Sequence, residues 1–347
     1  MNNYIVSRKY LQLQLKAFSG LNDVSSRRGG VYPHPRTCAD TVLGGDKPRQ
    51  YFGYRAVNEY TCRRVIKSSF LQLLCGHNTR FLFRTALLFL AFVFTAVAAD
   101  ARIIAKTIPY QSEGMKLKGY LAYDDAKTEK RPGVLVVHEW WGLTDDIRKR
   151  VDQLASMGYV AFALDLYGMG KTTTDMTKAT KMLRMVQMNG YRWAQRGLAG
   201  LKVLMNLPQV DSQRIAAIGY GWGGATLQQL VFKGTDIKGA VLFGSFTPPS
   251  ADQVKRVKAT ILVLQGSADP YLDPNELTDY IGAMDKSGLD WQMVLFGGAK
   301  QGFSDPNAAQ YKMKEFAYNQ AADRRSWKQV ELFLSELFQI ADPKIDK

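Results

Sequence analysis

Cysteine and histidine are nearly absent from the larger part of this chain. All three cysteines, Cys38, Cys62 and Cys75, lie before position 100 of the 347 residues, and the rest holds a single histidine, His138. Without thiols, the downstream part can form neither a disulfide nor a Cys–His catalytic pair. One histidine is also too few for the common metal sites, so we expect no metal and no cofactor.

Acidic residues are scarce only at the start of the chain. Residues 1–99 hold 14 of the 46 Lys and Arg residues but only 4 of the 31 Asp and Glu residues, which leaves residues 100–347 with a net charge of +5 out of +15. The downstream part has no basic cluster interleaved with aromatic residues. We therefore expect no nucleic-acid partner.

Residues 80–99 have the organisation of a secretory signal peptide. An arginine-containing start precedes an apolar run at residues 85–97, and the small residues Ala98 and Ala99 suit cleavage. A membrane anchor is the alternative, but the run is shorter than the ~20 apolar residues that a spanning helix needs. We therefore expect a protein that is secreted or periplasmic after cleavage near Ala98 or Ala99, with no stable membrane span in its mature form.

The segment before this signal, residues 1–79, is rich in Arg, Gly and Ser and shows no sustained periodicity. No methionine lies between Met1 and Met115. One hypothesis is a mis-set translation start, with the true start at a Leu or Val codon near residues 71–74. The alternative is a genuine targeting extension, rich in arginine and poor in acidic residues. Residues 100–347 form the expected folded domain.

From residue 103 onward, short β-rich runs alternate with longer helical stretches. The predicted strands are residues 103–109, 115–123, 133–137, 159–164, 215–218, 239–243, 260–264 and 291–296. The predicted helices are residues 145–157, a region over 175–205 that breaks near 189–190, the stretch from the turn after 218 to about 232, and residues 274–287 and 323–338. This alternation predicts an α/β protein with a mostly parallel central sheet, helices on both faces and functional groups at the carboxyl ends of the strands.

Residues 214–225, Arg-Ile-Ala-Ala-Ile-Gly-Tyr-Gly-Trp-Gly-Gly-Ala, have the pattern of a nucleophile elbow, in which a strand turns sharply into a helix. Glycines on both sides of the apex allow the tight turn. The apex itself is Gly221, which has no side chain that could attack a substrate. Either other residues carry out hydrolase chemistry, or the chain has kept a hydrolase fold without that chemistry.

Four further loops, taken with this elbow, resemble the dienelactone hydrolase family over about residues 103–340. Their motifs are His-Glu-Trp-Trp-Gly-Leu at 138–143, Ala-Leu-Asp-Leu-Tyr-Gly at 163–168, Leu-Gln-Gly-Ser-Ala-Asp-Pro at 264–270 and Gly-Gly-Ala-Lys-Gln-Gly-Phe at 297–303. Several separate motifs in the right order make the resemblance specific. It implies the α/β-hydrolase fold and, by family, the hydrolysis of esters or lactones.

The family's activity uses a Cys, an Asp and a His. By this resemblance the Asp position is Asp269, whereas the Cys and His positions fall on Gly221 and Gln301. Three serines lie on loops of the domain: Ser245, Ser267 and Ser304. None has an evident general base, because the amide of Gln301 is hardly basic and His138 lies on another loop.

The resemblance also implies a pocket around Glu139, which matches a carboxylate that contacts the resting nucleophile in the family. The backbone N–H groups of Trp140 and Trp222 match the family's oxyanion hole. Glu139 could instead be a structural carboxylate bonded to loop amides, or it could pair with Gln301 or water. The rings of Trp140, Trp141 and Trp222 could line a cleft or pack in the core.

Two classes of function remain open. The loss of both nucleophile and base at Gly221 and Gln301 favours a pseudoenzyme that binds a small-molecule ligand or a protein partner. The retained Asp269, together with Glu139 and the oxyanion donors, favours instead an active carboxylic-ester or lactone hydrolase with a non-family mechanism. Turnover of a simple aryl ester distinguishes the two.

Overall fold

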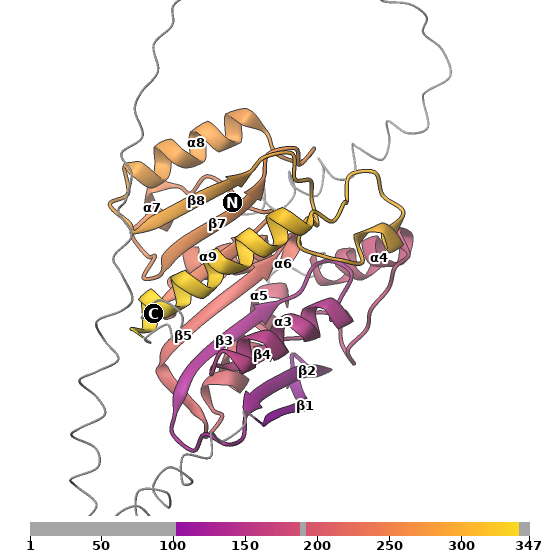
Figure 1. Ribbon diagram of the computed structural model, residues 1–347, viewed down its shortest axis with the longest axis vertical. Coiled ribbons are helices and arrows are strands. Elements are labelled where there is room, and N and C mark those ends of the chain that lie inside the picture. Colours follow the sequence, from indigo (N-terminus) through magenta and orange to yellow (C-terminus); the bar gives the residue numbers. More distant parts are fainter. Residues whose placement is uncertain (1–101, 188–191, 340–347) are drawn as a thin grey trace, which may run out of the picture. The chain divides into compact units, whose positions relative to one another are not determined.

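Eight strands form one sheet at the centre of residues 102–187 and 192–339, the parts of the chain that the computed structural model describes (Figure 1). The strands are β1 (Ile103–Ser112), β2 (Met115–Asp124), β3 (Arg131–Val137), β4 (Val160–Ala163), β5 (Val210–Tyr220), β6 (Gly239–Phe243), β7 (Thr260–Gly266) and β8 (Trp291–Phe296). Their order across the sheet is β1-β2-β4-β3-β5-β6-β7-β8. The pairs β1–β2 and β2–β4 are antiparallel and the other neighbours are parallel, which confirms the predicted sheet.

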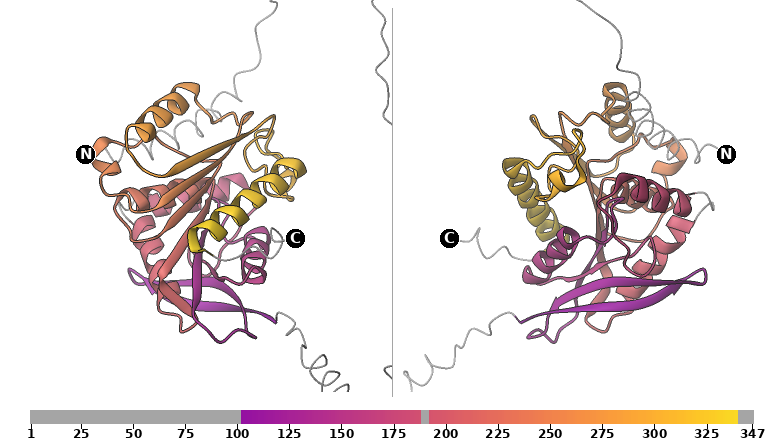
Figure 2. Two further views of the ribbon diagram at one scale, coloured as in Figure 1. Left: turned by 60° about the vertical axis from the view of Figure 1, so that its left-hand side comes forward. Right: turned by 90° about the vertical axis from the view of Figure 1, so that its right-hand side faces the viewer.

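The helices lie on both faces of this sheet (Figure 2). The long ones are α3 (Asp145–Ser156), α4 (Met176–Gln187), α5 (Arg192–Met205), α6 (Trp222–Phe232), α8 (Pro274–Asp285) and α9 (Gln320–Phe338), with a short α7 (Ala251–Val254) and a 3-10 turn, η2 (Ala308–Tyr311). One core cluster joins α3 and α9 to the sheet through residues such as Val151 and Leu334. The other joins α4, α5, α6 and α8 to the opposite face through residues such as Leu204 and Tyr280.

The burial of each strand follows its place in the sheet. Every residue of β3 and of β6 is buried, because helices cover both faces there and, apart from Arg131 at the start of β3, the strands have no charged or polar side chain. The edge strand β8 is only partly buried along most of its length. The carboxyl ends of the central strands β3, β5, β6 and β7 therefore meet at one edge of a rigid, well-packed sheet, where the loops that follow them converge.

Several predicted boundaries differ from the structure by two to five residues, among them the end of β1 and the starts of β5 and α9. Strand β5 begins at Val210, earlier than predicted, because Val210 and Asp211 pair with Arg131 and Pro132 of β3 before an irregularity in the register. Helix α9 begins at Gln320, because the side chain of Asn319 accepts a hydrogen bond from the Ala322 N–H and caps the helix there.

The predicted upstream extension at residues 1–79 and the predicted signal peptide at residues 80–99 lie outside the described residues. Export through that segment therefore stays a prediction from the sequence. The expected break near residues 189–190 also falls in an undescribed link, between α4 and α5. Within the described ranges, no helix is both long and apolar enough to cross a membrane.

Candidate functional site

Gly221 lies at the sharp turn between β5 and α6. Its φ of 47° and ψ of −115° belong to a backbone region that residues with a Cβ enter only with strain. Its N–H donates to the carbonyl oxygen of Phe243 at 2.7 Å. A Cβ on Gly223 would lie 2.3 Å from the carbonyl oxygen of Val137, so α6 can pack this closely against β3 only with glycine there. The predicted strand–turn–helix is present, with a glycine at its apex.

The carboxyl group of Glu139 fills the space in front of this apex. A Cβ built on Gly221 would lie 1.7 Å from Glu139 Oε2, far inside contact distance. Glu139 Oε1 accepts hydrogen bonds from the backbone N–H groups of Trp140 at 3.1 Å and Trp222 at 2.9 Å. The two donors expected to form an oxyanion hole therefore bind a carboxyl group of the protein itself.

The side chain of Gln301 lies between Glu139 and Asp269. In one amide orientation, Gln301 Nε2 donates to Glu139 Oε2 at 3.4 Å. In the opposite orientation, which suits both polar atoms of the amide better, the nitrogen donates to Asp269 Oδ2 at 2.5 Å and to the Gly244 carbonyl oxygen at 3.2 Å. The amide oxygen then faces Glu139, an arrangement that suits a protonated carboxyl group. The structure thus brings Glu139, Gly221, Gln301 and Asp269 together.

A cavity that opens to solvent lies beside Gly221, Glu139 and Gln301. Residues that the sequence did not single out form much of its wall: Asp146, Tyr220, Phe303, Asp305, Tyr311 and Phe316. They come from the start of α3, the end of β5 and the long loop after β8. Tyr220 and Phe303 lie in motifs already noted, but an aspartate in the first turn of a helix is an ordinary feature of sequences, and no motif marks Asp305, Tyr311 or Phe316. Their place around one cavity can be recognised only in the folded structure.

The model of the dienelactone hydrolase family matches residues 117–338. The chain belongs to this family. Protein usf of Aquifex pyrophilus is 24% identical over 67% of this chain and 99% of its own length. A protein of Saccharolobus solfataricus, provisionally named a carboxymethylenebutenolidase, is 26% identical over 66% of this chain and 97% of its own length. The dienelactone hydrolase-like promiscuous phosphotriesterase P91, from metagenomic libraries, superposes with a TM-score of 0.65 at 30% identity, over 68% of this chain and 99% of that chain. The resemblance and the α/β-hydrolase fold inferred from the sequence are confirmed.

Burial raises the pKa of both carboxyl groups at the site of this dienelactone hydrolase family member. The pKa of Glu139 rises to about 7, although the N–H groups of Trp222 and Trp140 favour its charged form. The pKa of Asp269 rises to about 6, again through burial, against hydrogen bonds from the Tyr271 N–H and the Gln265 amide. The site therefore holds two carboxyl groups that can exchange protons near neutral pH.

We expect the protein to lose stability as the pH rises from about 4.5 to about 7. The unfolded chain releases the Glu139 proton near its ordinary pKa of 4.5, whereas the folded protein keeps it until about 7. The folded state therefore binds more protons in this window, and its free energy of unfolding falls with rising pH. Asp146 and Asp269 contribute with the same sign. Urea unfolding at a series of pH values measures the slope.

The Glu139→Gln variant should show a flatter decline, because a neutral amide keeps the acceptor for the Trp140 and Trp222 N–H groups but has no proton to release. Glu129→Gln, on an exposed loop, is the matched control and should leave the slope unchanged. An identical slope in wild type and Glu139→Gln would mean that folding does not raise the pKa of Glu139.

His138 is fully buried and does not point to the site. Its Nδ1 lies 2.7 Å from the carbonyl oxygen of Glu139, and its Nε2 accepts the Leu166 N–H at 3.1 Å. These partners assign the proton to Nδ1, and burial lowers the pKa of the ring. His138 therefore holds the backbone of Glu139 in place as a neutral ring and cannot serve the elbow as a base.

All three tryptophans pack in the core, and one of them also lines the cavity. Trp140 and Trp222 are 3% and 6% exposed and pack in the core cluster on the α5 and α6 face. Their backbones, and not their rings, face Glu139. Of the three, only Trp141 lines the cavity beside Gly221, where it stacks on Tyr311 with ring centroids 3.9 Å apart.

None of the three loop serines has a base in the described part of the chain. Ser245 is buried and its hydroxyl has no partner there. The hydroxyl of Ser267 accepts the Gly298 N–H at 3.0 Å on the surface. Ser304 lines the cavity, and its carbonyl oxygen accepts a hydrogen bond from Arg150. An orthodox serine mechanism therefore lacks its second member.

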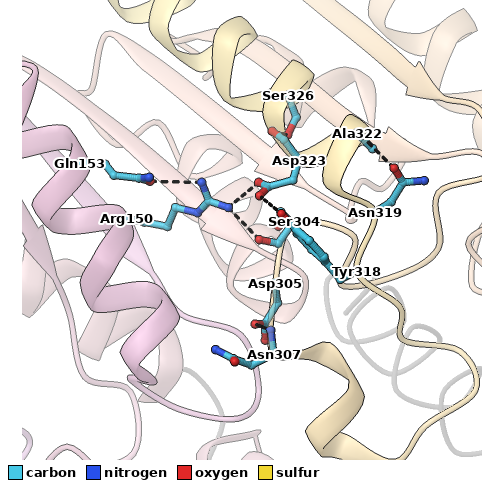
Figure 3. A network of polar contacts seen from close by, with 10 residues as sticks. All are labelled: Arg150, Gln153, Ser304, Asp305, Asn307, Tyr318, Asn319, Ala322, Asp323 and Ser326. Carbon is cyan, nitrogen blue, oxygen red and sulfur yellow. Dashed lines mark hydrogen bonds and ion pairs between the residues drawn. The ribbon is translucent and has the colours of Figure 1, made fainter.

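A buried ion pair holds the long loop that follows β8 (Figure 3). Arg150 of α3 donates to Asp323 of α9 at 2.5 Å, to the Ser304 carbonyl oxygen at 2.7 Å and to Gln153 at 3.2 Å. The hydroxyl of Tyr318 donates to the same carboxylate at 3.1 Å. These contacts tie α3, α9 and the loop together and so position the wall of the cavity that carries Ser304.

Proposed function

We propose that this dienelactone hydrolase family member binds a small-molecule ligand in the cavity beside Gly221 and lacks the thiol-based ester hydrolysis of its family. The observation that carries the proposal is the position of Glu139. Its carboxyl group occupies the space that a nucleophile on residue 221 would need, and it caps the two N–H groups that would stabilise an oxyanion.

The chemistry of the neighbouring positions supports the same conclusion. Gly221 offers no nucleophile, and the domain downstream of position 99 contains no cysteine. Gln301 lies where it could orient a partner between Glu139 and Asp269, but its amide cannot accept a proton from a thiol or a hydroxyl at neutral pH. Covalent catalysis needs both groups, and this chain has neither at the elbow.

A hydrolytic function with a different mechanism is the second candidate. Glu139 and Asp269 are two buried carboxyl groups with raised pKa values, joined through Gln301. Such a pair could activate a water molecule as the nucleophile, and the relative P91 is described as a promiscuous phosphotriesterase. Phosphotriesters therefore belong beside esters in any activity test of this chain.

We expect the wild-type protein to hydrolyse activated aryl esters and aryl phosphotriesters no faster than its own Asp269→Ala variant. Hydrogen-bond donors around the site can leave a small residual rate of hydrolysis in an enzyme that has lost its triad. A small wild-type rate is therefore judged against the rate of the Asp269→Ala variant. Initial rates over a range of substrate concentrations, with protein freed of contaminating esterases, measure this.

Asp279→Ala is the control for the effect of mutation itself, because Asp279 is exposed on α8 and away from the cavity. A wild-type rate that saturates with substrate, persists in Asp279→Ala and vanishes in Asp269→Ala would overturn the ligand-binding proposal in favour of the second candidate.

A further inference from the structure

The cavity beside Gly221 is acidic. Three carboxyl groups line it, from Glu139, Asp146 and Asp305, and among the lining residues within the described ranges there is no lysine or arginine. The walls between these acids are aromatic, with rings from residues that include Trp141, Tyr220 and Phe316. A site built to hold an anion would place cationic side chains here instead.

Asp146 has no partner for its charge. The residue is only 8% exposed, and no side chain or backbone group in residues 102–187 and 192–339 donates a hydrogen bond to its carboxyl group. By contrast, Asp305 accepts from the Asn307 N–H at 2.7 Å and from the Tyr311 hydroxyl at 3.0 Å. A buried carboxylate is costly without donors, and Asp146 faces a cavity from which a ligand could supply them.

Two further polar groups in the cavity wall are unsatisfied. The hydroxyl of Tyr220 and the indole N–H of Trp141 are buried and have no hydrogen-bond partner in the described part of the chain. Tyr220 and Asp146 both line the cavity, and the fields of Arg150 and Asp146 both act on the Tyr220 hydroxyl. Tyr220 and Asp146 thus form a pair of acceptors at the junction of β5 and α3.

The nearest cation is already engaged. Arg150 lies one helical turn beyond Asp146 on α3, and its field acts on Asp146, as do those of Lys149, Asp305 and Asp323. However, Arg150 pairs directly with Asp323 and donates to the Ser304 carbonyl oxygen (Figure 3). Lys149 is exposed to solvent. Burial raises the pKa of Asp146 to about 7, so its carboxyl group is only partly ionised at neutral pH, and a bound cation would favour the charged form.

The arrangement does not suit a metal ion. In the parts of the chain that the structure describes, no three His, Cys, Asp or Glu side chains converge closely enough to hold one. Aromatic walls with separated carboxyl groups suit an organic cation better, because rings attract a cation through their faces while carboxylates accept its N–H groups.

We propose that the cavity binds a primary organic ammonium group, which donates hydrogen bonds to Asp146 and Tyr220 while the body of the ligand contacts the aromatic wall. This inference rests on the proposed ligand-binding function and specifies the chemical class of the ligand. It predicts selectivity by charge: a cation should bind better than a neutral or anionic molecule of the same size and shape.

The test compares benzylammonium, benzyl alcohol and benzoate as probes of nearly equal size. Binding is followed by calorimetry and by the fluorescence of the protein's tryptophans, with the full chain at neutral pH and fixed ionic strength. We expect benzylammonium to bind at least about tenfold more tightly than benzyl alcohol, the ratio expected of one charge-assisted hydrogen bond, and benzoate not to bind.

Two variants locate the site. Asp146→Asn should weaken benzylammonium binding about tenfold, whereas Asp145→Asn, which removes an equal charge from the exposed neighbouring position, should change it less than about twofold. Tyr220→Phe should also weaken binding. It should not destabilise the free protein, because the hydroxyl it removes has no partner there. Urea unfolding of each variant confirms that the fold is intact.

The outcomes separate this inference from the function on which it rests. Equal or tighter binding of benzoate, or no binding of benzylammonium at concentrations up to about 10 mM, overturns the cation inference and leaves the loss of hydrolysis untouched. Equal effects of Asp145→Asn and Asp146→Asn also overturn it, because the attraction would then be a general surface effect. Saturable ester hydrolysis lost in Asp269→Ala overturns the proposed function alone.

Discussion

The double variant Gly221→Cys, Gln301→His should gain a thiol-dependent esterase activity that neither single variant shows. The cysteine supplies a nucleophile at the elbow, and the histidine, placed beside Asp269 where Gln301 now lies, supplies its base. The two act as a unit, so we expect the double variant to exceed either single variant by ~10²-fold or more. A burst of product from an activated aryl ester, followed by stopped-flow absorbance, measures the acylation step.

The cysteine of this double variant needs space that Glu139 now occupies. A Cβ at position 221 would collide with Glu139 Oε2, so the cysteine can be accommodated only if the Glu139 carboxyl group turns away. That movement would free the N–H groups of Trp140 and Trp222 to stabilise an oxyanion. The substitution should therefore supply the nucleophile and open the oxyanion hole together.

The Gly221→Cys substitution should lower the free energy of unfolding. The left-handed backbone at Gly221 disfavours a Cβ by ~1–2 kcal/mol, and the contact with Glu139 adds to this. Gly282→Ala is the matched control, since a Cβ there meets nothing within 4 Å. In a helix interior this change should be neutral or stabilise the protein by up to ~1 kcal/mol.

Iodoacetamide should abolish the new activity. The treated wild type serves as the control for Cys38, Cys62 and Cys75, which lie upstream of the domain. A double variant with an unchanged circular dichroism spectrum but no acylation burst would contradict the assignment of Gly221 and Gln301 to the family's nucleophile and base positions.

Arg150→Met should lower the free energy of unfolding by about 3–5 kcal/mol, the usual cost of removing one partner of a buried ion pair. The side chains of Arg150 and Asp323 are 7% and 14% exposed, so the variant leaves a carboxylate without its cation in a dry environment. It also removes the hydrogen bond to the Ser304 carbonyl oxygen and so loosens the loop beside the cavity. Urea unfolding at neutral pH measures the loss.

Arg148→Met is the control on the same helix. Arg148 pairs at 3.7 Å with Asp145, whose side chain is 91% exposed, so this variant should lose no more than about 1 kcal/mol. The double variant Arg150→Met, Asp323→Leu should recover much of the stability, because no charge is then left buried. Equal losses in Arg148→Met and Arg150→Met would show that the buried pair adds nothing.

Much of the fold could be predicted because local sequence and burial agree in the central strands. The predicted strands at residues 239–243 and 291–296 coincide with β6 and β8. For β6 the reason is that a short apolar run between helices can be satisfied only inside a covered sheet. The start of β5 could not be predicted in this way. Residues 211–214 are polar, and only the pairing of Val210 and Asp211 with Arg131 and Pro132, far away in the chain, starts the strand there.

The sequence by itself determined the family, the glycine apex at Gly221, the amide at Gln301 and the carboxylate at Asp269, because each follows from residue identity within a motif. Only the tertiary structure decided what those positions do to one another. The rotamer of Glu139, which fills the apex and caps the Trp140 and Trp222 N–H groups, depends on β3 and β5 lying side by side.

The acidic cavity was likewise decided by the fold alone. Asp146, Tyr220 and Asp305 belong to three elements that meet only when the sheet and its loops have assembled. Burial raises the pKa of both aspartates and leaves the Tyr220 hydroxyl without a partner among the described residues, and burial is a property of the assembled fold. A motif records which residues are present, whereas their distances and their exposure to water arise from long-range packing.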